Sequence, residues 1–376
     1  MKSKPKIALV YDRVNKIGGA ERVLETLFEL FPEAPLYTSV YNPSTAKWAR
    51  EIHVKPSFLQ RFSWARENHE YFAWAMPSVV ESFDFDQYDI VISVTSAEAK
   101  GLITKPGTLH LCYLLTPTRY LWSHAHFYAD HGVKGKRGFL KPFMIPMMSN
   151  LRMWDYYAAQ RPDKIAAISE VVQDRVKKYY RREVDAIISP PVEPLPTPDQ
   201  EYELPEEYYL IVSRLVPYKR IGLAIKACNQ LKKRLVIVGE GSQLSELKNI
   251  AGETITFAGK VSQSKLSAYY RNCKALLFPG EEDFGIVCVE AQSVGKPVIC
   301  YSAGGAAEII QNHTTGVFFD QQEVKSIVEA IKSFETMHIS AKACQRNSQR
   351  FSVGRFKKSF SRFVEESWEN HLKTNI

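Results

Sequence analysis

Two carboxylates are the residues of this sequence with the clearest capacity for chemistry. Glu282 and Glu290 lie in the stretch FPGEEDFGIVCVE (278–290), with seven residues between them across a loop-to-helix junction. At ~1.5 Å per helical residue this offset spans roughly 12 Å, comparable to the distance from a sugar ring to a ribose across a diphosphate. Each carboxylate could accept hydrogen bonds from hydroxyls at one end of a nucleotide sugar. An acidic surface loop before an ordinary core helix is the alternative interpretation of EED alone.

The same stretch predicts an anion-binding backbone. If Phe284, Gly285 and Ile286 open a helix, their unpaired N–H groups and the positive end of the helix dipole face a bound phosphate. Gly285 has no Cβ, so the backbone can approach phosphate oxygens closely. We therefore predict that these three residues bind an anionic ligand.

A basic pair follows an apolar strand pattern in the second half of the chain. Arg214 and Lys219 lie in SRLVPYKR, directly after residues 208–214. Two cations at the carboxyl end of a parallel strand can neutralise a diphosphate, and arginine offers a bidentate fork. A solvent-facing basic loop is the alternative for this fragment by itself.

Glycines occupy the turns after several predicted strands. Gly18 and Gly19 lie between the first strand and its helix, and Gly239 and Gly241 follow a strand in IVGEGS, as the pair 304–305 does in SAGGAAEII. Such glycines let a base, ribose or phosphate approach the backbone, although tight packing turns use the same residues. The first segment is not G-x-G-x-x-G and has no acidic residue placed for a ribose, which disfavours a dinucleotide site.

Two segments raise the question of a metal ion. Asp84 and Asp86 form D-x-D, but they precede a strand, whereas a metal site is expected at a strand's end; we interpret them as a turn. SHAHFYADHG contains four possible ligands without a second cluster elsewhere, so an ordinary loop is the better interpretation. These four residues are His124, His126, Asp130 and His131.

Length and composition indicate an ordinary globular protein of two domains. The chain has 376 residues, of which 45% are hydrophobic and 24% charged. It contains no uninterrupted apolar run of about 18 residues and no signal-peptide pattern, so we expect a cytoplasmic protein. The six cysteines form no C-x-x-C pair, which favours reduced, packed thiols.

The formal net charge of +8 predicts attraction to polyanions. Residues 131–148 interleave basic with large apolar side chains, a pattern that suits an anionic membrane surface. A solvated loop followed by a core segment explains the same pattern equally well.

Short apolar runs alternate with helical patterns, which predicts an α/β fold with parallel sheets. The proline-rich residues 190–207 predict a semi-rigid linker between an N-terminal domain (1–190) and a C-terminal domain (205–350). Residues 354–376 predict a closing helix that packs back on the N-terminal domain. Ligands of such sheets bind at the carboxyl ends of the strands. The expected strands are 6–12, 89–96, 109–115, 164–169 and 184–189, then 208–214, 234–241, 255–261, 274–280, 296–305 and 315–320.

These motifs together resemble a known enzyme family. In order, GGAERV, SRLVPYKR, VGEG, EEDFGIVCVEAQSVGKPVI and GGAAEII resemble family 4 of the retaining glycosyltransferases, which have the GT-B fold of two doubly wound Rossmann-like domains facing an interdomain cleft. LCYLLTPTRYLW (111–122) is similar to a subgroup of bacterial mannosyl- and related hexosyltransferases that build surface polysaccharides.

The resemblance implies roles for the residues of the C-terminal domain. Glu282 would hold hydroxyls of the transferred sugar, and Glu290 would bind the donor ribose. Arg214 and Lys219 would stabilise the diphosphate leaving group, assisted by backbone around Gly285. Cations and a helix dipole would replace the divalent metal of other glycosyltransferases, so no metal or other cofactor is expected.

The resemblance also implies roles in the N-terminal domain. Gly19 would lie near the diphosphate, and Arg119 and Tyr120 would lie on the acceptor or sugar side. The family commonly has a histidine directly before the Thr-Pro of its first-domain motif, and this chain has Leu115 there. Front-face attack, in which the leaving phosphate takes the acceptor proton, needs no side-chain base.

The sequence therefore predicts a metal-independent retaining hexosyltransferase. We expect a GDP-sugar or UDP-sugar donor, a lipid-linked or growing surface-glycan acceptor reached from the cytoplasmic face of the membrane, and no nucleic acid partner. Two alternatives remain: a nucleotide-sugar epimerase of the same fold, or a non-catalytic module that binds a polyanion or membrane and has kept a degenerate donor site.

Overall fold

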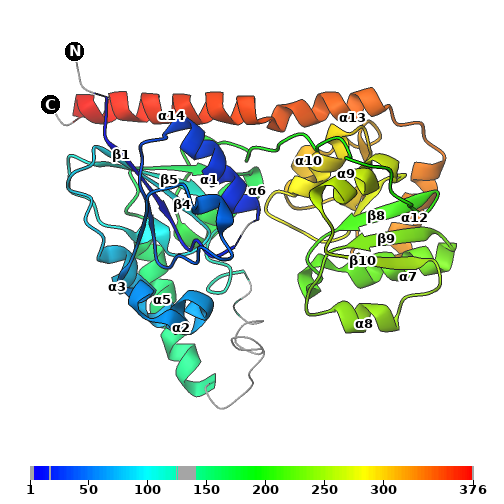
Figure 1. The fold of residues 1–376 in the computed structure, drawn as a ribbon, viewed down its shortest axis with the longest axis horizontal. Coiled ribbons are helices and arrows are strands. Elements are labelled where there is room, and N and C mark those ends of the chain that lie inside the picture. Colours follow the sequence, from blue (N-terminus) through cyan, green and yellow to red (C-terminus); the bar gives the residue numbers. More distant parts are fainter. Residues whose placement is uncertain (1–3, 17, 124, 126–140, 375–376) are drawn as a thin grey trace. The chain divides into compact units, whose positions relative to one another are not determined.

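The computed structural model describes residues 4–16, 18–123, 125 and 141–374 (Figure 1). The chain divides into two compact units. The first comprises residues 1–190 and 356–376, and the second comprises residues 191–355. Each unit has a parallel sheet of its own, and each is described by itself below.

The first unit contains a seven-stranded sheet in the order β3-β2-β1-β4-β5-β6-β7. All of its pairings are parallel. Five strands were predicted from the sequence and are confirmed, whereas β2 and β3 were missed because each has only three residues. The strands are β1 (Ile7–Tyr11), β2 (Leu36–Thr38), β3 (Val54–Pro56), β4 (Ile90–Thr95), β5 (Leu109–Leu114), β6 (Lys164–Ala167) and β7 (Ala186–Ile187).

Helices cover this sheet because each buries one apolar face. The side-chain oxygen of Ser169 accepts a hydrogen bond from the N–H of Val172 and caps α6. In the long C-terminal helix, Phe356 and Phe360 lie edge-on to Tyr113 of β5, with ring centroids 5.8 and 5.6 Å away. The helices are α1 (Gly19–Leu30), α2 (Ser63–Glu67), α3 (Met76–Glu81), α5 (Lys141–Ala158), α6 (Glu170–Tyr180) and α14 (Val353–Thr374).

The second unit contains a six-stranded parallel sheet in the order β10-β9-β8-β11-β12-β13. All six strands were predicted from the sequence and are confirmed. Their apolar side chains pack with α7 and α12 into one core. The strands are β8 (Tyr208–Val212), β9 (Arg234–Val238), β10 (Ile255–Gly259), β11 (Leu276–Phe278), β12 (Val298–Tyr301) and β13 (Gly316–Phe319). The helices are α7 (Ile221–Leu231), α8 (Leu244–Asn249), α9 (Gln263–Asn272), α10 (Ile286–Ser293), α11 (Gly305–Ile309), α12 (Val324–Glu335) and α13 (Ala341–Ser348).

The proline-rich stretch after residue 190 is attached to the second unit rather than suspended as a linker. The side chain of Ser267 on α9 donates to the carbonyl of Pro196, 2.5 Å away, and the N–H of Asp199 donates to Ser264, 3.0 Å away. These bonds fix an otherwise irregular segment, because side chains of α9 donate to one of its carbonyls and accept from one of its N–H groups in place of secondary-structure partners.

Several smaller predictions concern the same elements. Asp84 and Asp86 form a turn before β4, in which the N–H of Asp86 donates to the Asp84 carboxylate at 2.8 Å. All six cysteines are buried free thiols, as predicted. No helix among the described residues is both long enough and apolar enough to span a membrane. The histidine-containing segment 124–131 lies outside the described residues, apart from Ala125.

Candidate active site

The loop after β8 presents the predicted basic pair. Arg214 is exposed, and its guanidinium donates to the hydroxyl of Tyr218 at 2.8 Å. The Lys219 ammonium lies 5.2 Å from the centre of the same ring, a cation–π distance. Tyr218 therefore holds the two cations together, a role that the sequence motif did not suggest.

Lys219 forms an ion pair with Glu282, which follows β11, the neighbour of β8 in the sheet. The Lys219 and Glu282 side chains are 11% and 21% exposed. A pair this far from bulk water is less screened than a surface pair, so each charge fixes the position of the other. Both side chains line a small hollow at the carboxyl end of the sheet, together with Ser213 and Gly280.

Glycines allow the loop that carries Glu282 to pack tightly between two others. A Cβ on Gly280 would lie 2.9 Å from the Cα of Lys219, and one on Gly305 would lie 2.4 Å from the Cα of Phe284. The N–H of Gly305 donates to the carbonyl of Glu282 at 2.8 Å. Three loops, after β8, β11 and β12, are thus packed backbone to backbone, which fixes Glu282 without any bound ligand.

The predicted helix after this loop is confirmed, with its first residue at Ile286. Gly285 is the residue before it and has φ 103°, a conformation that side chains disfavour. Phe284 is buried, and its ring packs edge-on against Phe351 with centroids 5.5 Å apart. The side chain of Phe284 therefore anchors the helix start, and only the backbone of these residues can face an anion.

Glu290 lies inside α10 and is buried, 4% exposed. The hydroxyl of Tyr270 on α9 donates to its Oε2 at 2.8 Å. Burial raises the pKa of Tyr270 well above its ordinary value, and the negative charge of Glu290 raises it further. Tyr270 therefore stays a hydrogen-bond donor and holds the orientation of this carboxylate.

Gly239 and Gly241 pack against the loop that carries Arg214. A Cβ on Gly239, which has φ 130°, would lie 1.9 Å from the carbonyl oxygen of Ser213, and one on Gly241 would lie 2.3 Å from that of Leu215. The N–H of Leu215 donates to the carbonyl of Glu240 at 2.9 Å. Close packing of the two loops requires glycine at both positions, and their role in donor binding stays a prediction.

In the first unit, Gly19 begins α1 directly after the loop that follows β1, as predicted, and it is exposed. The first turn of α1 is anchored by Glu21, which is 1% exposed and accepts a hydrogen bond from Tyr11 of β1 at 2.8 Å. The start of this helix is therefore fixed to the carboxyl end of its strand.

Tyr120 belongs to a chain of polar groups at the carboxyl ends of β1, β4 and β5. Its hydroxyl donates to Glu98 at 2.8 Å, and the other oxygen of Glu98 pairs with Arg13. Burial, followed by the charge of Glu98, raises the pKa of Tyr120 well above its ordinary value. Arg119 is half-buried in the same turn. Arg13 and Glu98 were not identified from the sequence.

A second buried network holds the segment 116–122. Asp155 of α5 pairs with Lys100 at 2.5 Å and accepts hydrogen bonds from Thr118, Trp122 and Tyr180 at 2.7, 2.7 and 2.8 Å. Lys100 and Asp155 are each 1% exposed. This carboxylate therefore fixes the turn that contains Arg119 and Tyr120.

The residues of these networks that were not predicted from the sequence have partners far along the chain. Glu98 lies 85 residues from Arg13, and Asp155 lies 55 residues from Lys100. A single charged residue in a buried context, such as Lys100 after an apolar strand, was the available signal. Among the described residues no group of three or more acidic, histidine or cysteine side chains is arranged to hold a metal ion.

Comparison with known proteins assigns part of the chain. Residues 196–351 match the family model described as "Glycosyl transferases group 1". The chain is 31% identical over 161 residues to a GDP-mannose-dependent alpha-(1-6)-phosphatidylinositol monomannoside mannosyltransferase of Mycobacterium tuberculosis, covering 36% of this chain and 42% of that protein. It is 28% identical over 158 residues to a sulfoquinovosyl transferase of Arabidopsis thaliana, covering 39% and 31%. The chain thus spans less than half the length of these curated relatives.

Solved structures match over nearly the whole chain and confirm the predicted GT-B fold. The apo form of the lipopolysaccharide outer core galactosyltransferase WaaB superposes with a TM-score of 0.64 at 18% identity, covering 99% of this chain and 100% of that one. HepE of Anabaena in complex with UDP-glucose superposes with a TM-score of 0.67 at 18% identity, covering 96% and 100%. At this identity the superpositions establish the fold alone.

Proposed function

We propose that this protein is a retaining glycosyltransferase of the family 4 type, which moves a hexose, with mannose as the expected sugar, from a GDP-sugar or UDP-sugar to a lipid-linked or surface-glycan acceptor. The match of residues 196–351 to group 1 glycosyl transferases supports transfer. The names of the mannosyltransferase relative and of the HepE complex support a nucleotide-sugar donor. The observation that carries the proposal is the cluster of Arg214, Lys219 and Glu282 directly before the first turn of α10.

In this proposal the cations bind the donor diphosphate. Arg214 is exposed and offers a planar fork to two phosphate oxygens. The Lys219 ammonium has three N–H donors, so it can keep Glu282 and contact a phosphate oxygen at the same time. The first N–H groups of α10, after Gly285, add positive potential at the same place. This charge replaces a divalent metal, and no metal is required.

The two carboxylates hold the sugars of the donor. Glu282 accepts hydrogen bonds from hydroxyls of the hexose, and Glu290 accepts them from the ribose. A carboxylate has about four lone-pair positions, so the bond from Tyr270 leaves Glu290 further capacity. Tyr270 and Lys219 thus act as positioning residues for the two acids.

The transfer itself is a front-face substitution. The bond between the anomeric carbon and the diphosphate oxygen breaks, and a bond from the acceptor oxygen to that carbon forms on the same face. The acceptor proton goes to the departing phosphate, so Leu115 in place of a histidine is compatible with activity. Stabilisation of the leaving-group charge is the main contribution of the protein.

The acceptor is proposed to bind the first unit near Arg119 and Tyr120, at the cytoplasmic face of the membrane. Two buried polar atoms at the carboxyl ends of β1 and β5, Nε of Arg13 and Oγ1 of Thr116, have no hydrogen-bond partner among the described residues. Unpaired buried polar atoms are uncommon, and a role in the reaction is one explanation for them.

The test combines ligand binding with turnover. Thermal shift with UDP, GDP and ADP identifies the base, because only a bound ligand raises the midpoint. Release of nucleoside diphosphate from the matching donor, and NMR of the transferred sugar's anomeric centre, then measure activity and stereochemistry. We expect Glu282→Ala to reduce turnover about 1,000-fold with the nucleotide thermal shift retained, and Arg214→Ala to weaken both. Wild-type activity should persist in excess EDTA.

Four outcomes would contradict all or part of the proposal. Unchanged activity of Glu282→Ala removes the assigned role of that carboxylate. Nucleotide binding without any turnover favours the non-catalytic module, and release of an epimerised donor favours the epimerase. An inverted anomeric centre in the product contradicts retention while leaving transfer intact.

A further inference from the structure

Exposed aromatic side chains gather in one short segment of the first unit. Phe58, Phe62, Trp64 and Trp74 are 45%, 57%, 54% and 63% exposed, and we call these four residues the aromatic surface. Phe58 lies on the short 3-10 helix η2 (Phe58–Arg61) and Trp74 on the 3-10 helix η3 (His69–Ala75), whereas Trp64 lies on α2 and Phe62 between η2 and α2. Four large rings within 17 residues, exposed to this degree, exceed the scattered exposure of ordinary surfaces.

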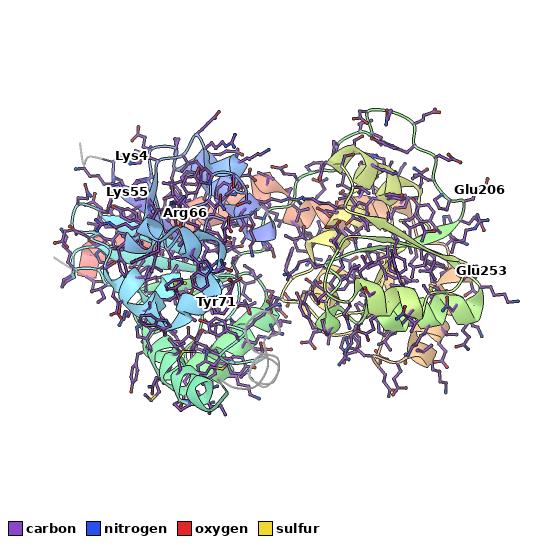
Figure 2. All side chains as sticks on the ribbon, turned by 60° about the horizontal axis from the view of Figure 1, so that its bottom comes forward. Lys4, Lys55, Arg66, Tyr71, Glu206 and Glu253 are labelled. Carbon is purple, nitrogen blue, oxygen red and sulfur yellow. The ribbon has the colours of Figure 1, made fainter. Side chains whose placement is uncertain are left out.

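The aromatic surface is held by packed residues below it. The Trp64 ring stacks on Tyr71 with centroids 5.2 Å apart and lies edge-on to Phe72 at 5.5 Å. Phe72 in turn packs against a small buried core that contains Leu59 and Met76. Figure 2 marks Tyr71 on this segment. The Trp64 ring is therefore held in place by packed residues, which lowers the entropy lost when it binds a partner.

Helix α5 adds a second apolar face. Ile145, Met153 and Tyr157 are 55%, 59% and 67% exposed, and with Ser149 they recur every fourth residue along one side. The opposite side is buried and includes Asp155. No charged residue stands at positions 145, 146, 149, 150, 153 or 157 of this outward side. A solvated helix face normally carries charges, so this side is suited to a non-aqueous neighbour.

The two apolar regions lie at the same end of the first unit. Trp154 of α5 donates its indole N–H to Glu81 of α3 at 2.8 Å, so the two helices touch. Figure 1 shows α2, α3 and α5 gathered at this end. The nine large hydrophobic side chains that are exposed in the described part of the chain all belong to the first unit.

Charge is distributed as unevenly as the exposed apolar area. The first unit has 30 lysine and arginine residues against 23 aspartate and glutamate residues, a balance of +7, whereas the second has 19 against 18, a balance of +1. Nearly all of the net charge of +8 therefore belongs to the unit with the exposed rings. Positive charge attracts anionic lipid headgroups, and each basic residue near the surface contributes about 1 kcal/mol.

We propose that the aromatic surface and the outward side of α5 bind the headgroup region of an anionic lipid membrane. Tryptophan and phenylalanine concentrate at membrane interfaces, and the aliphatic Ile145 and Met153 suit the acyl boundary. Single-stranded nucleic acid would also use rings and positive charge, but it has no use for the aliphatic Ile145 and Met153. This inference does not involve the donor site; it rests on the proposed function in that the acceptor is reached at a membrane, and it names the surface that would bind there.

The test is flotation of the full chain with lipid vesicles, without donor or acceptor. We expect binding to phosphatidylcholine vesicles that contain about 30% phosphatidylglycerol, weaker binding to phosphatidylcholine alone, and a decrease as NaCl rises from about 0.1 M to about 0.5 M. The double variant Phe62→Ser/Trp74→Ser should lose at least about tenfold in partition coefficient. Both side chains are exposed, so its thermal midpoint should stay within about 2 °C of wild type.

A matched control variant tests whether vesicle binding depends on where the exposed hydrophobic side chains lie or only on how many there are. Ile103 and Ile187 are also exposed on the first unit, at 54% and 41%, but lie outside the aromatic surface and α5. Ile103→Ser/Ile187→Ser should bind vesicles within about twofold of wild type. Equal losses in both double variants, or no binding of wild type to anionic vesicles, overturns the proposal.

Self-association provides the competing outcome. If sedimentation shows wild type as a dimer that Phe62→Ser/Trp74→Ser converts to a monomer, the surface is a protein interface and the membrane assignment is wrong. Donor hydrolysis measured without vesicles reports on the transfer proposal separately. Vesicle binding with no turnover, and turnover with no vesicle binding, are therefore distinguishable results.

Discussion

The charged groups at the carboxyl ends of the two sheets are arranged in opposite ways. In the first unit, Lys100 and Asp155 are each 1% exposed and satisfy one another with neighbouring hydroxyls and an indole. In the second, Arg214 is exposed, and Lys219 and Glu282 keep part of their surface in solvent. Buried charges that are fully paired stabilise a local structure, whereas charges that keep access to solvent remain available to a ligand.

The buried network of the first unit therefore has a structural role, whereas the partly exposed cluster of the second unit can bind a ligand. The buried carboxylate of Asp155 fixes the turn around Arg119 and Tyr120 but does not offer itself to a substrate. The pair Lys219–Glu282 and its neighbour Arg214 lie on loops that pack against one another through glycine backbones. We therefore expect substitutions in the first network to change stability and substitutions in the second cluster to change binding and turnover.

The largest expected effect on stability is that of Asp155→Ala. It leaves the Lys100 ammonium buried without its counter-charge, which costs about 3 to 5 kcal/mol of free energy of unfolding. Tryptophan emission in a urea titration measures this, because every tryptophan belongs to the first unit and the signal reports on that unit alone. These residues are Trp48, Trp64, Trp74, Trp122, Trp154 and Trp368.

The exposed cation of the second cluster provides the control for this comparison. Arg214→Ala should leave the tryptophan-monitored free energy of unfolding within about 0.5 kcal/mol of wild type. A loss for Asp155→Ala that is as small as this would show that the buried network does not stabilise the first unit, and the contrast between the two sheet edges would fail.

Acid should weaken the first unit through a buried histidine. Burial lowers the pKa of His110 on β5 to about 3, with the charges of Arg182 and Arg161 adding to the effect. The unfolded chain, with a pKa near 6.5, binds a proton that the folded unit excludes, so stability is lost as pH falls from about 6.5 toward about 3. Between pH 7 and pH 4 this contributes a loss of about 3 kcal/mol.

His110→Gln removes the side chain that takes up the proton in the unfolded chain. It keeps a polar group near Ser93, with which His110 makes a hydrogen bond of 2.9 Å in the wild type. The variant will be less stable at pH 7, but its tryptophan-monitored stability should fall less between pH 7 and pH 4 than that of wild type. Parallel pH profiles for the two proteins would show that His110 is not the titrating group. The strands of the second sheet contain no histidine.

The fold was predictable because its signals are local. All eleven strands expected from apolar runs are present, and proline and glycine marked most of the boundaries between them. The two missed strands, β2 and β3, have three residues each, too few to show a period. The attachment of residues 195–199 to α9 could not be predicted, because it depends on side chains such as Ser264 and Ser267 about 70 positions later.

The candidate site was also predictable only where its residues belong to local sequence motifs. Arg214, Lys219 and Glu282 belong to contiguous motifs that the sequence displays. In the structure Tyr218 contacts both cations, and Lys219 pairs with Glu282. The pairing of Glu98 with Arg13 cannot be predicted from a linear sequence pattern, because the two residues are 85 positions apart. Local chemistry can thus be predicted from spacing, whereas a polar network between strands requires the sheet order.

A smaller effect is expected from the glycine that supports the basic loop. Gly239→Ala places a Cβ against the carbonyl oxygen of Ser213 at a φ of 130°, so the loop with Arg214 must move. We expect a loss of about 2 kcal/mol in the stability of the second unit, and nucleoside diphosphate binding weakened about tenfold. Calorimetry measures the stability of the second unit, and a binding titration measures the affinity for nucleoside diphosphate.

Gly259→Ala is the matched control, since its φ is 65° and a Cβ there would meet no atom within 4 Å. It should cost about 1 kcal/mol from backbone strain while binding stays unchanged. Equal effects of the two variants on nucleotide binding would mean that the fit between the two loops does not position Arg214.

The smallest effect, and the sharpest test of how the second cluster is organised, is that of Tyr218→Phe. The substitution removes the hydroxyl that accepts from Arg214 at 2.8 Å but keeps the ring beside Lys219. Arg214 then loses one of the contacts that orient its guanidinium, a loss of about 1 kcal/mol, so the KM for the donor should rise about threefold to tenfold with kcat nearly unchanged. Stability should not change, because Arg214 is exposed.

Tyr218→Ala removes the ring as well and should lower kcat in addition, since Lys219 loses its cation–π contact and with it part of what positions Glu282. If Tyr218→Phe instead lowered kcat and left KM unchanged, the hydroxyl would act in the transition state and Tyr218 would belong among the residues that contact the substrate.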